Sequence, residues 1–402
     1  MKTSMEYMMR SILQHKMSEN RCNGQIMKAM LLLFLLFSFE LKAEQLSDKL
    51  DRKSVLIAAE KVADWQLSNL PALDWWTWPS DHIYGKYLLD WEYGAFYSGL
   101  MDLYKTDSKE KYLTSMLDMG KKYRWNIRPR PLDANVLCIG HMYIDLYNLK
   151  KDPAMIEMIG FGLNANLDRQ PVVPDVTFKD NKYWEIWWSW CDALYMAPPT
   201  FAMYAKATGQ SRYLEKMNEL YMITYNYLYD KDEKLFFRDD RFFTEKSPTG
   251  KKIFWARGNG WVIAGLVKLL KVIPEDFHNV QFYETLFKEM SYRFRDIQQP
   301  EGYWSSSLLD PVQYGGIETS GTGFICYALA YGINNGYLNR DEYLPVVEKA
   351  WKLLVKCIHP DGKLGFVQRV GDSPDSVSFD NTASYGVGAF LSAASEVAKL
   401  SK

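Results

Sequence analysis

ALYMAPPTFAMYAKA, residues 193–207, is followed by SRYLEKMNELYM, residues 211–222, and the contrast between these segments decides the fold. The first is apolar on nearly all sides and rich in small residues, so a helix formed by it must be covered all round. The second places Leu214, Met217 and Leu220 at helical spacing, with Lys, Glu and Asn between them. That pattern predicts an amphipathic helix with one buried face. The pair therefore indicates an inner helix followed by an outer one.

The same contrast recurs along the chain, as expected of a repeat architecture. Amphipathic segments near residues 112–119 and 347–354 are predicted outer helices. Six inner helices alternating with outer ones predict an all-α (α/α)6 toroid, with residues 44–402 as one catalytic domain, because neither layer can bury its surface alone. An open solenoid or an irregular helical array is the alternative. The other predicted inner helices, in which Gly and Ala allow close backbone approach, are residues 91–104, 133–147, 260–272, 321–332 and 385–398.

The connections carry weaker signals. Ser108 and Ser211 each precede or begin an amphipathic segment, and we predict that they cap the following helices. The sequence KLFFR, residues 234–238, and the pair Phe242-Phe243 flank an acidic turn, which predicts a small hairpin outside the helical layers.

The first 43 residues predict a leader with a secretory signal peptide. An apolar run of 11 residues, 29–39, follows Met27-Lys28, and Leu41 and Ala43 suit a cleavage site after Ala43. The run is too short to span a bilayer. The polar residues before it are unusual for a signal peptide, so we expect the true start to be Met27. The mature protein is expected to be secreted or periplasmic.

Composition excludes several function classes. The formal net charge is −1 and basic residues do not cluster, so we expect neither a nucleic-acid partner nor membrane association of the mature form. CxxC spacing is absent and only five His residues occur, so we expect no metal and no cofactor. The 14 Trp and 27 Tyr suit either a large core or a sugar site, because aromatic faces bind sugar C–H groups.

Carboxylates, one Arg and aromatic residues recur where the inner helices should begin. A carboxylate at a helix start is also the ordinary product of capping. Recurrence at several inner helices, beside a Trp at Asp90 and at Asp192, indicates instead a shared sugar pocket. A loop with Trp75, Trp76 and Trp78 is predicted to be a lid or a leaving-group subsite, with a packing plug as the alternative. The residues that recur at the helix starts are Asp90, Trp91, Glu92, Asp133, Trp190, Asp192, residues 255–261, Glu318 and Tyr385.

Two segments carry a resemblance to a known superfamily. WWSWCDALYMAPPTFAMYAKATG, residues 187–209, and WARGNGWVIAGLVKLLKVIP, residues 255–274, resemble the strongest motifs of the unsaturated glucuronyl and unsaturated rhamnogalacturonyl hydrolases, glycoside hydrolase families 88 and 105. DWEYGAFYSGLMDLY, LDANVLCIGHMYIDLY and ETSGTGFICYALAYGI are similar to its other blocks in the same order. The blocks fit family 105 somewhat better. The resemblance implies the (α/α)6 barrel that the repeat pattern already predicts.

The resemblance also implies the site residues. Asp192 is implied as the general acid/base and Asp133 as its helper. Arg238, in LFFRDD, stands where many members have His, which exchanges a hydrogen bond to the sugar for a charge. Arg257 is a candidate partner of the substrate carboxylate, with an ion pair to a protein carboxylate as the equal alternative. The residues implied to line the sugar subsite with Arg238 and Arg257 are Trp91, Trp190, Trp255 and Trp261.

The implied reaction suits these residue types. Lyases leave a C4=C5 double bond on the terminal uronic acid of an oligosaccharide, and this bond is a vinyl ether through the ring oxygen. Protonation at C4 and addition of water at C5 give a hemiketal that opens and releases the rest of the chain. One carboxyl group can donate the first proton and accept one from water. Asp192 must therefore begin protonated, and burial and an ionised Asp133 would both raise its pKa.

Three other functions remain open from the sequence. An inverting glycosidase acting on saturated glycans would use two separated carboxylates on the same fold. A sugar 2-epimerase would need His bases, which are scarce here, and His141 and His82 are expected to be structural. A non-catalytic glycan-binding protein would keep the aromatic walls without needing Asp133 and Asp192.

Overall fold

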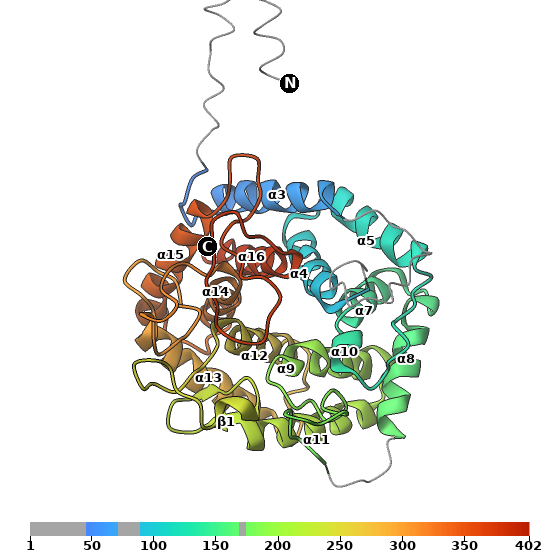
Figure 1. The fold of residues 1–402 in the computed structure, drawn as a ribbon. Coiled ribbons are helices and arrows are strands. Elements are labelled where there is room, and N and C mark those ends of the chain that lie inside the picture. The colour runs from blue at the N-terminus through green and yellow to red at the C-terminus, as the bar shows by residue number, and fades with distance from the viewer. Residues whose placement is uncertain (1–45, 71–88, 169–173, 402) are drawn as a thin grey trace, which may run out of the picture. The chain divides into compact units, whose positions relative to one another are not determined.

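The computed structural model describes residues 46–70, 89–168 and 174–401. The predicted leader and the loop with Trp75, Trp76 and Trp78 lie outside the described residues. The chain from Leu46 onward forms one compact unit, in which helices form an inner and an outer ring (Figure 1). The inner ring consists of α4 (Trp91–Asp107), α7 (Gly140–Lys150), α10 (Pro198–Thr208), α12 (Ala256–Leu270), α14 (Thr319–Asn334) and α16 (Ser384–Val397). The outer ring consists of α3 (Arg52–Ser68), α5 (Glu110–Lys122), α8 (Ala154–Leu167), α11 (Ser211–Leu228), α13 (Val280–Ile297) and α15 (Arg340–Lys356).

The inner ring is closed. Going round it, α4 packs against α7, α7 against α10, α10 against α12, α12 against α14, α14 against α16, and α16 returns to α4. The outer helices pack on the outside of this ring, for example α11 on α10 and α15 on α14. The predicted (α/α)6 toroid is therefore confirmed, and the open solenoid is excluded because the last inner helix contacts the first.

Two inner helices are interrupted where the sequence analysis predicted continuous ones. The second is divided into α6 (Ala134–Leu137) and α7, and the third into α9 (Ala193–Met196) and α10. At the second interruption Pro198 and Pro199 begin α10. Proline has no backbone N–H to donate, and its ring clashes with the carbonyl four residues earlier, so two successive prolines favour a break in the helix at this point.

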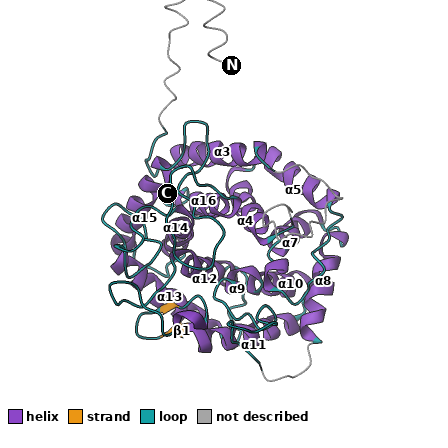
Figure 2. Cartoon of the chain, viewed as in Figure 1, coloured by secondary structure: helices purple, strands orange, loops and turns teal. Residues whose placement is uncertain are grey.

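The predicted caps and hairpin need correction. Ser108 ends α4 in a left-handed conformation, with φ of 61°, and its N–H bonds the carbonyl of Tyr104 at 2.7 Å, so it closes one helix rather than opening the next. Ser211 is the first residue of α11, and the N-cap position before it is Gln210, whose side chain makes no capping hydrogen bond. The short strand β1 (Tyr229–Asp230) pairs with β2 (Leu235–Phe236), drawn in orange in Figure 2.

Phe242 belongs to a 3₁₀ turn, Asp240–Phe242, instead of a strand. The carboxylate of Asp239 accepts a hydrogen bond from the backbone N–H of Arg241 and caps this turn. KLFFR thus contributes a strand to a hairpin, as predicted, but its partner is Tyr229–Asp230 and not the predicted pair Phe242-Phe243.

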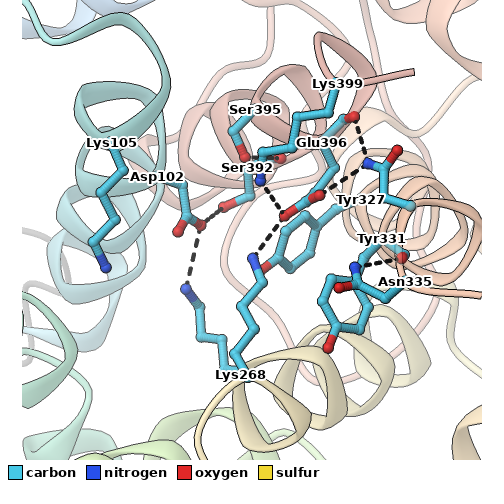
Figure 3. Close-up of polar contacts among 12 residues, drawn as sticks. Asp102, Lys105, Lys268, Tyr327, Tyr331, Asn335, Ser392, Ser395, Glu396 and Lys399 are labelled. Carbon is cyan, nitrogen blue, oxygen red and sulfur yellow. Dashed lines mark hydrogen bonds and ion pairs between the residues drawn. The ribbon is translucent and has the colours of Figure 1, made fainter. Parts of the chain in front are cut away.

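A buried charged cluster joins three inner helices toward their carboxyl ends (Figure 3). Asp102 of α4 lies 3.3 Å from Nζ of Lys268 and accepts a 2.8 Å hydrogen bond from Ser392. Lys271 donates to Glu396 at 2.8 Å. Burial alone would raise the pKa of Asp102, but the neighbouring lysines hold it well below its ordinary value. Removing one partner of such a cluster leaves a buried charge uncompensated, so the cluster requires all its members.

The ring closes through two glycines. A Cβ atom at Gly99 of α4 would lie 2.2 Å from the carbonyl oxygen of Gly388 in α16, and one at Gly388 would lie 2.3 Å from the carbonyl oxygen of Ala95. These are backbone atoms, which cannot rotate away. The expectation that small residues allow close approach of the inner helices is confirmed here.

We therefore predict that Gly99→Ala lowers the free energy of unfolding by about 1–3 kcal/mol or more, because overpacking forces α4 and α16 apart. Gly371→Ala is the control, since a Cβ there would meet nothing closer than 3.8 Å. Urea denaturation of both variants measures the difference. Equal stability of the two variants would contradict the close approach.

Candidate active site

Asp192 lies directly before α9 and is 8% exposed. Its Oδ2 accepts a 3.5 Å hydrogen bond from Sγ of Cys191 and lies 3.7 Å from Nε of Arg238. Its side chain makes no capping hydrogen bond to the helix, so capping does not explain why an Asp stands here. Burial raises the pKa of Asp192, and the charges of Arg238 and Arg257 partly offset the rise. Burial, one of the two causes expected from the sequence, is thus the largest, while the charge of Asp133, the other expected cause, is not among the main contributions to this pKa.

Asp133 occupies the corresponding position before α6, and α6 packs against α9. It is 5% exposed, and its Oδ1 accepts a 2.9 Å hydrogen bond from the backbone N–H of Asn135. Burial raises its pKa, while that hydrogen bond and the charges of Arg130 and Arg128 oppose the rise. Asp133 therefore caps its helix as well as standing at the amino ends of the inner helices.

Arg238 faces Asp192 from the segment after β2. Its Nη1 donates to Oδ2 of Asp239 at 2.7 Å, and its guanidinium lies 4.5 Å from the ring centre of Phe178. Its backbone carbonyl accepts a 2.9 Å hydrogen bond from the N–H of Cys191. This residue, expected from the sequence to contact the sugar, is therefore anchored by its guanidinium to Asp239 and by its backbone to Cys191, the residue before Asp192.

Arg257 is completely buried in the first turn of α12. It donates to the backbone carbonyls of Gln368 at 2.7 Å and Arg369 at 2.9 Å, and lies between the rings of Trp255 and Tyr385, 4.3 and 4.9 Å from their centres. Its terminal nitrogens thus hold a loop through carbonyl oxygens, and not through the protein carboxylate that was one of the two expected partners.

The four predicted tryptophans fall into two groups. Trp91 stacks on Tyr385, with 5.2 Å between ring centres, and meets the edge of Trp261 at 6.0 Å. Trp190 packs against a different ring, that of Trp184, with 4.6 Å between ring centres. Trp91 is partly exposed, whereas Trp190, Trp255 and Trp261 are buried. Trp261 is 0% exposed and packs within the inner ring, so it offers no face to a ligand in this structure.

Gln368 is a residue at the site that was not chosen from the sequence. Gln368 accepts hydrogen bonds through Oε1 from Trp255 and Ser306, both at 2.9 Å, and its own N–H bonds Glu318 at 3.2 Å. It lies in a loop between helices and carries no motif that could have marked it. Glu92, which the sequence placed among the polar residues at the inner helix starts, is 4% exposed, and burial and the charge of Asp90 raise its pKa to about 8.

The remaining candidate groups are His141 and the cysteines. His141 is buried, and burial holds its pKa well below the ordinary value, so it stays neutral. Cys138, Cys191, Cys326 and Cys357 are buried free thiols. Among the described residues no group of three metal-ligating side chains occurs. Within that same part of the chain, every helix is too short or too polar to cross a membrane.

Comparisons with known proteins agree with this architecture. The family model described as Glycosyl Hydrolase Family 88 matches residues 58–401. Two curated relatives are both named unsaturated 3S-rhamnoglycuronyl hydrolase. The one from Formosa agariphila is 43% identical over 80% of this chain and 88% of its own length. The one from Alteromonas sp. is 32% identical over 90% of each.

A solved structure, a glycosyl hydrolase family 88 protein from Bacteroides vulgatus, superposes with a TM-score of 0.75 at 29% identity, covering 86% of this chain and 98% of that one. The resemblance to the superfamily of families 88 and 105 seen in the sequence is thereby confirmed, and the family model that matches is that of family 88 and not of the preferred family 105. The structure is a closed toroid with buried carboxyl groups at its inner helix starts, and the family 88 sequence model matches nearly all of the described residues. The chain is therefore a glycoside hydrolase that belongs to glycosyl hydrolase family 88.

Proposed function

We propose that this hydrolase releases a terminal 4,5-unsaturated uronic acid from lyase-generated oligosaccharides by hydrating the C4=C5 vinyl ether. The observation that carries the proposal is the state of Asp192. It is buried, it has no capping role, and burial raises its pKa. A carboxyl group in such surroundings keeps its proton to a higher pH than an ordinary Asp and can deliver it to a substrate.

In this proposal Asp192 protonates C4, and the positive charge that forms at C5 is shared with the ring oxygen. Water adds at C5 after giving a proton to the Asp192 carboxylate, and the hemiketal opens and expels the leaving chain. Asp133 assists from the neighbouring helix start, where the packing of α6 on α9 supports a shared site. Trp91, the partly exposed member of the predicted wall, is the best placed for contact with the sugar.

The names of the relatives support a narrower substrate class. Both are unsaturated rhamnoglycuronyl hydrolases. We propose that the leaving group here is likewise a rhamnose-containing chain, which refines the wider expectation of a pectin-like or related source.

The competing functions receive less support. A 2-epimerase would need a His that titrates, and His141 is buried and neutral. A glycan-binding protein without activity would not need a buried carboxyl whose pKa is raised.

The test is incubation with a panel of oligosaccharides produced by polysaccharide lyases, following the ultraviolet absorbance of the conjugated double bond. The proposal expects loss of absorbance with at least one rhamnose-containing substrate. Retention of the absorbance throughout, with an enzyme that cleaves saturated glycans, would support the inverting glycosidase.

We also propose that the protein is exported, on the strength of the apolar run at residues 29–39. Mass spectrometry of the protein from its native host is expected to find a mature N-terminus near Glu44. Finding the whole leader on protein from the cytoplasmic fraction would contradict export.

A further inference from the structure

Three charged residues outside the predicted site form a chain behind Arg238. Asp239 is 0% exposed and accepts hydrogen bonds from Nη1 of Arg238 at 2.7 Å and from Nε and Nη2 of Arg241 at 2.8 and 2.9 Å. Arg241 in turn donates to Asp372 at 2.7 Å. The two guanidinium groups lie over the ring of Phe178, each 4.5 Å from its centre. Each of the two guanidinium groups is thus held by at least two neighbouring residues.

The contact between Arg238 and Asp192 is incomplete by comparison. Nε of Arg238 lies 3.7 Å from Oδ2 of Asp192, which is longer than a hydrogen bond, and this buried Nε has no hydrogen-bond partner. A free arginine beside a buried carboxylate would form a short, two-pronged ion pair with it. Here Nη1 is bonded to Asp239 instead.

We infer that Asp239 is a positioning residue, which holds the Arg238 guanidinium beside Asp192 and prevents the two from forming a full ion pair. The inference rests on the proposed role of Asp192 and deepens it. A full ion pair would stabilise the Asp192 carboxylate and remove the proton that the reaction needs first. The intermediate distance leaves a positive charge near enough to stabilise the carboxylate after it has given up that proton.

The charged and titratable groups around Asp192 come from four segments. Cys191 precedes it, Arg238 and Asp239 follow β2, Arg257 begins α12, and Asp133 precedes the neighbouring α6. Arg257 is bonded to two carbonyls and cannot replace Arg238 without breaking those bonds. Of the two cations near Asp192, Arg238 is therefore the one that can move toward it when the bond to Asp239 is removed.

The inference predicts opposite pH shifts for two variants. In Asp239→Asn, Arg238 is released toward Asp192, the pKa of Asp192 falls, and its protonated form is lost at lower pH. The alkaline limb of the kcat profile should move down by about one pH unit or more, with about tenfold less activity above it. In Arg238→Gln the stabilising cation is gone, so the same limb should move up.

Asp240→Asn is the matched control. Asp240 adjoins Asp239 and bonds the N–H of Phe178 and the hydroxyl of Tyr227, both at 3.2 Å, so its loss disturbs the same segment without releasing Arg238. Its alkaline limb should stay within a few tenths of a unit of the parent. If Asp239→Asn alone fails to fold, Asp239→Asn/Arg241→Gln removes one charge of each sign and still releases Arg238.

The pKa of Asp192 can also be measured without substrate, by a pH titration followed through carboxyl ¹³C NMR. The signal is assigned by its absence from the spectrum of Asp192→Asn. A lower Asp192 pKa in the Asp239 variants and a higher one in Arg238→Gln support the inference. Unshifted titration in folded Asp239 variants, or shifts of the same sign in both, would overturn it. Failure of the parent enzyme on every unsaturated substrate refutes the proposed function instead, because the NMR comparison does not depend on activity.

Discussion

Asp192→Asn is expected to lower kcat on unsaturated oligosaccharides by on the order of a hundredfold to ten-thousandfold, because the amide cannot supply a proton to C4. The fold should survive, since burial already favours the neutral form of this carboxyl and Asn keeps its size. Steady-state kinetics with loss of ultraviolet absorbance measure the effect, and the thermal unfolding midpoint checks the fold.

Asp118→Asn serves as the control for this substitution. Asp118 is an exposed residue of α5, so the same chemical change there should leave kcat within about twofold. Asp133→Asn should fall between the two, as expected of a helper that also caps α6. Near-normal turnover by a correctly folded Asp192→Asn protein would remove Asp192 from the mechanism.

The second large effect concerns the bond that is attacked. Substrates with a terminal unsaturated uronate are expected to be cleaved, and their saturated counterparts to be inert. In heavy water, deuterium should appear at C4 of the released sugar, because the acid delivers its proton to that carbon. NMR or mass spectrometry of the product measures the label.

Direct attack at the anomeric carbon would give a different product. It would leave C4 unlabelled and would preserve the double bond in the first sugar released. An unlabelled product that keeps the double bond would make the protein an inverting or retaining glycosidase, even if Asp192 proved essential.

Much of the fold could be predicted because the pattern of apolar and polar residues within one segment indicates which faces of its helix are buried. Residues 193–207 are apolar on nearly all sides, which is typical of a helix that is covered all round, and α9 and α10 lie in the inner ring. The alternation of such segments with amphipathic ones was enough to order the two rings. Pro198 and Pro199, which interrupt the third inner helix, are also visible in the sequence, although this helix was predicted to be continuous.

The candidate site was predicted only in part. The positions of Asp192 and Asp133 before inner helices follow from short motifs. The partners of Arg257 do not, because they are backbone carbonyls 111 and 112 residues further along the chain, in a loop without a motif. A backbone carbonyl can belong to any residue, so nothing in the sequence marks it as a partner.

The sequence by itself determined which helix faces are buried and which inner helix starts carry carboxyl groups, since both are patterns within a few turns of one segment. Only the tertiary structure decided what each buried charge meets. Lys268 sits in an apolar helix and meets Asp102, 166 residues away, while Arg238 meets both Asp239 and Asp192. The physical reason is that burying a charge requires a partner, whereas its identity depends on which segments the closed ring brings together.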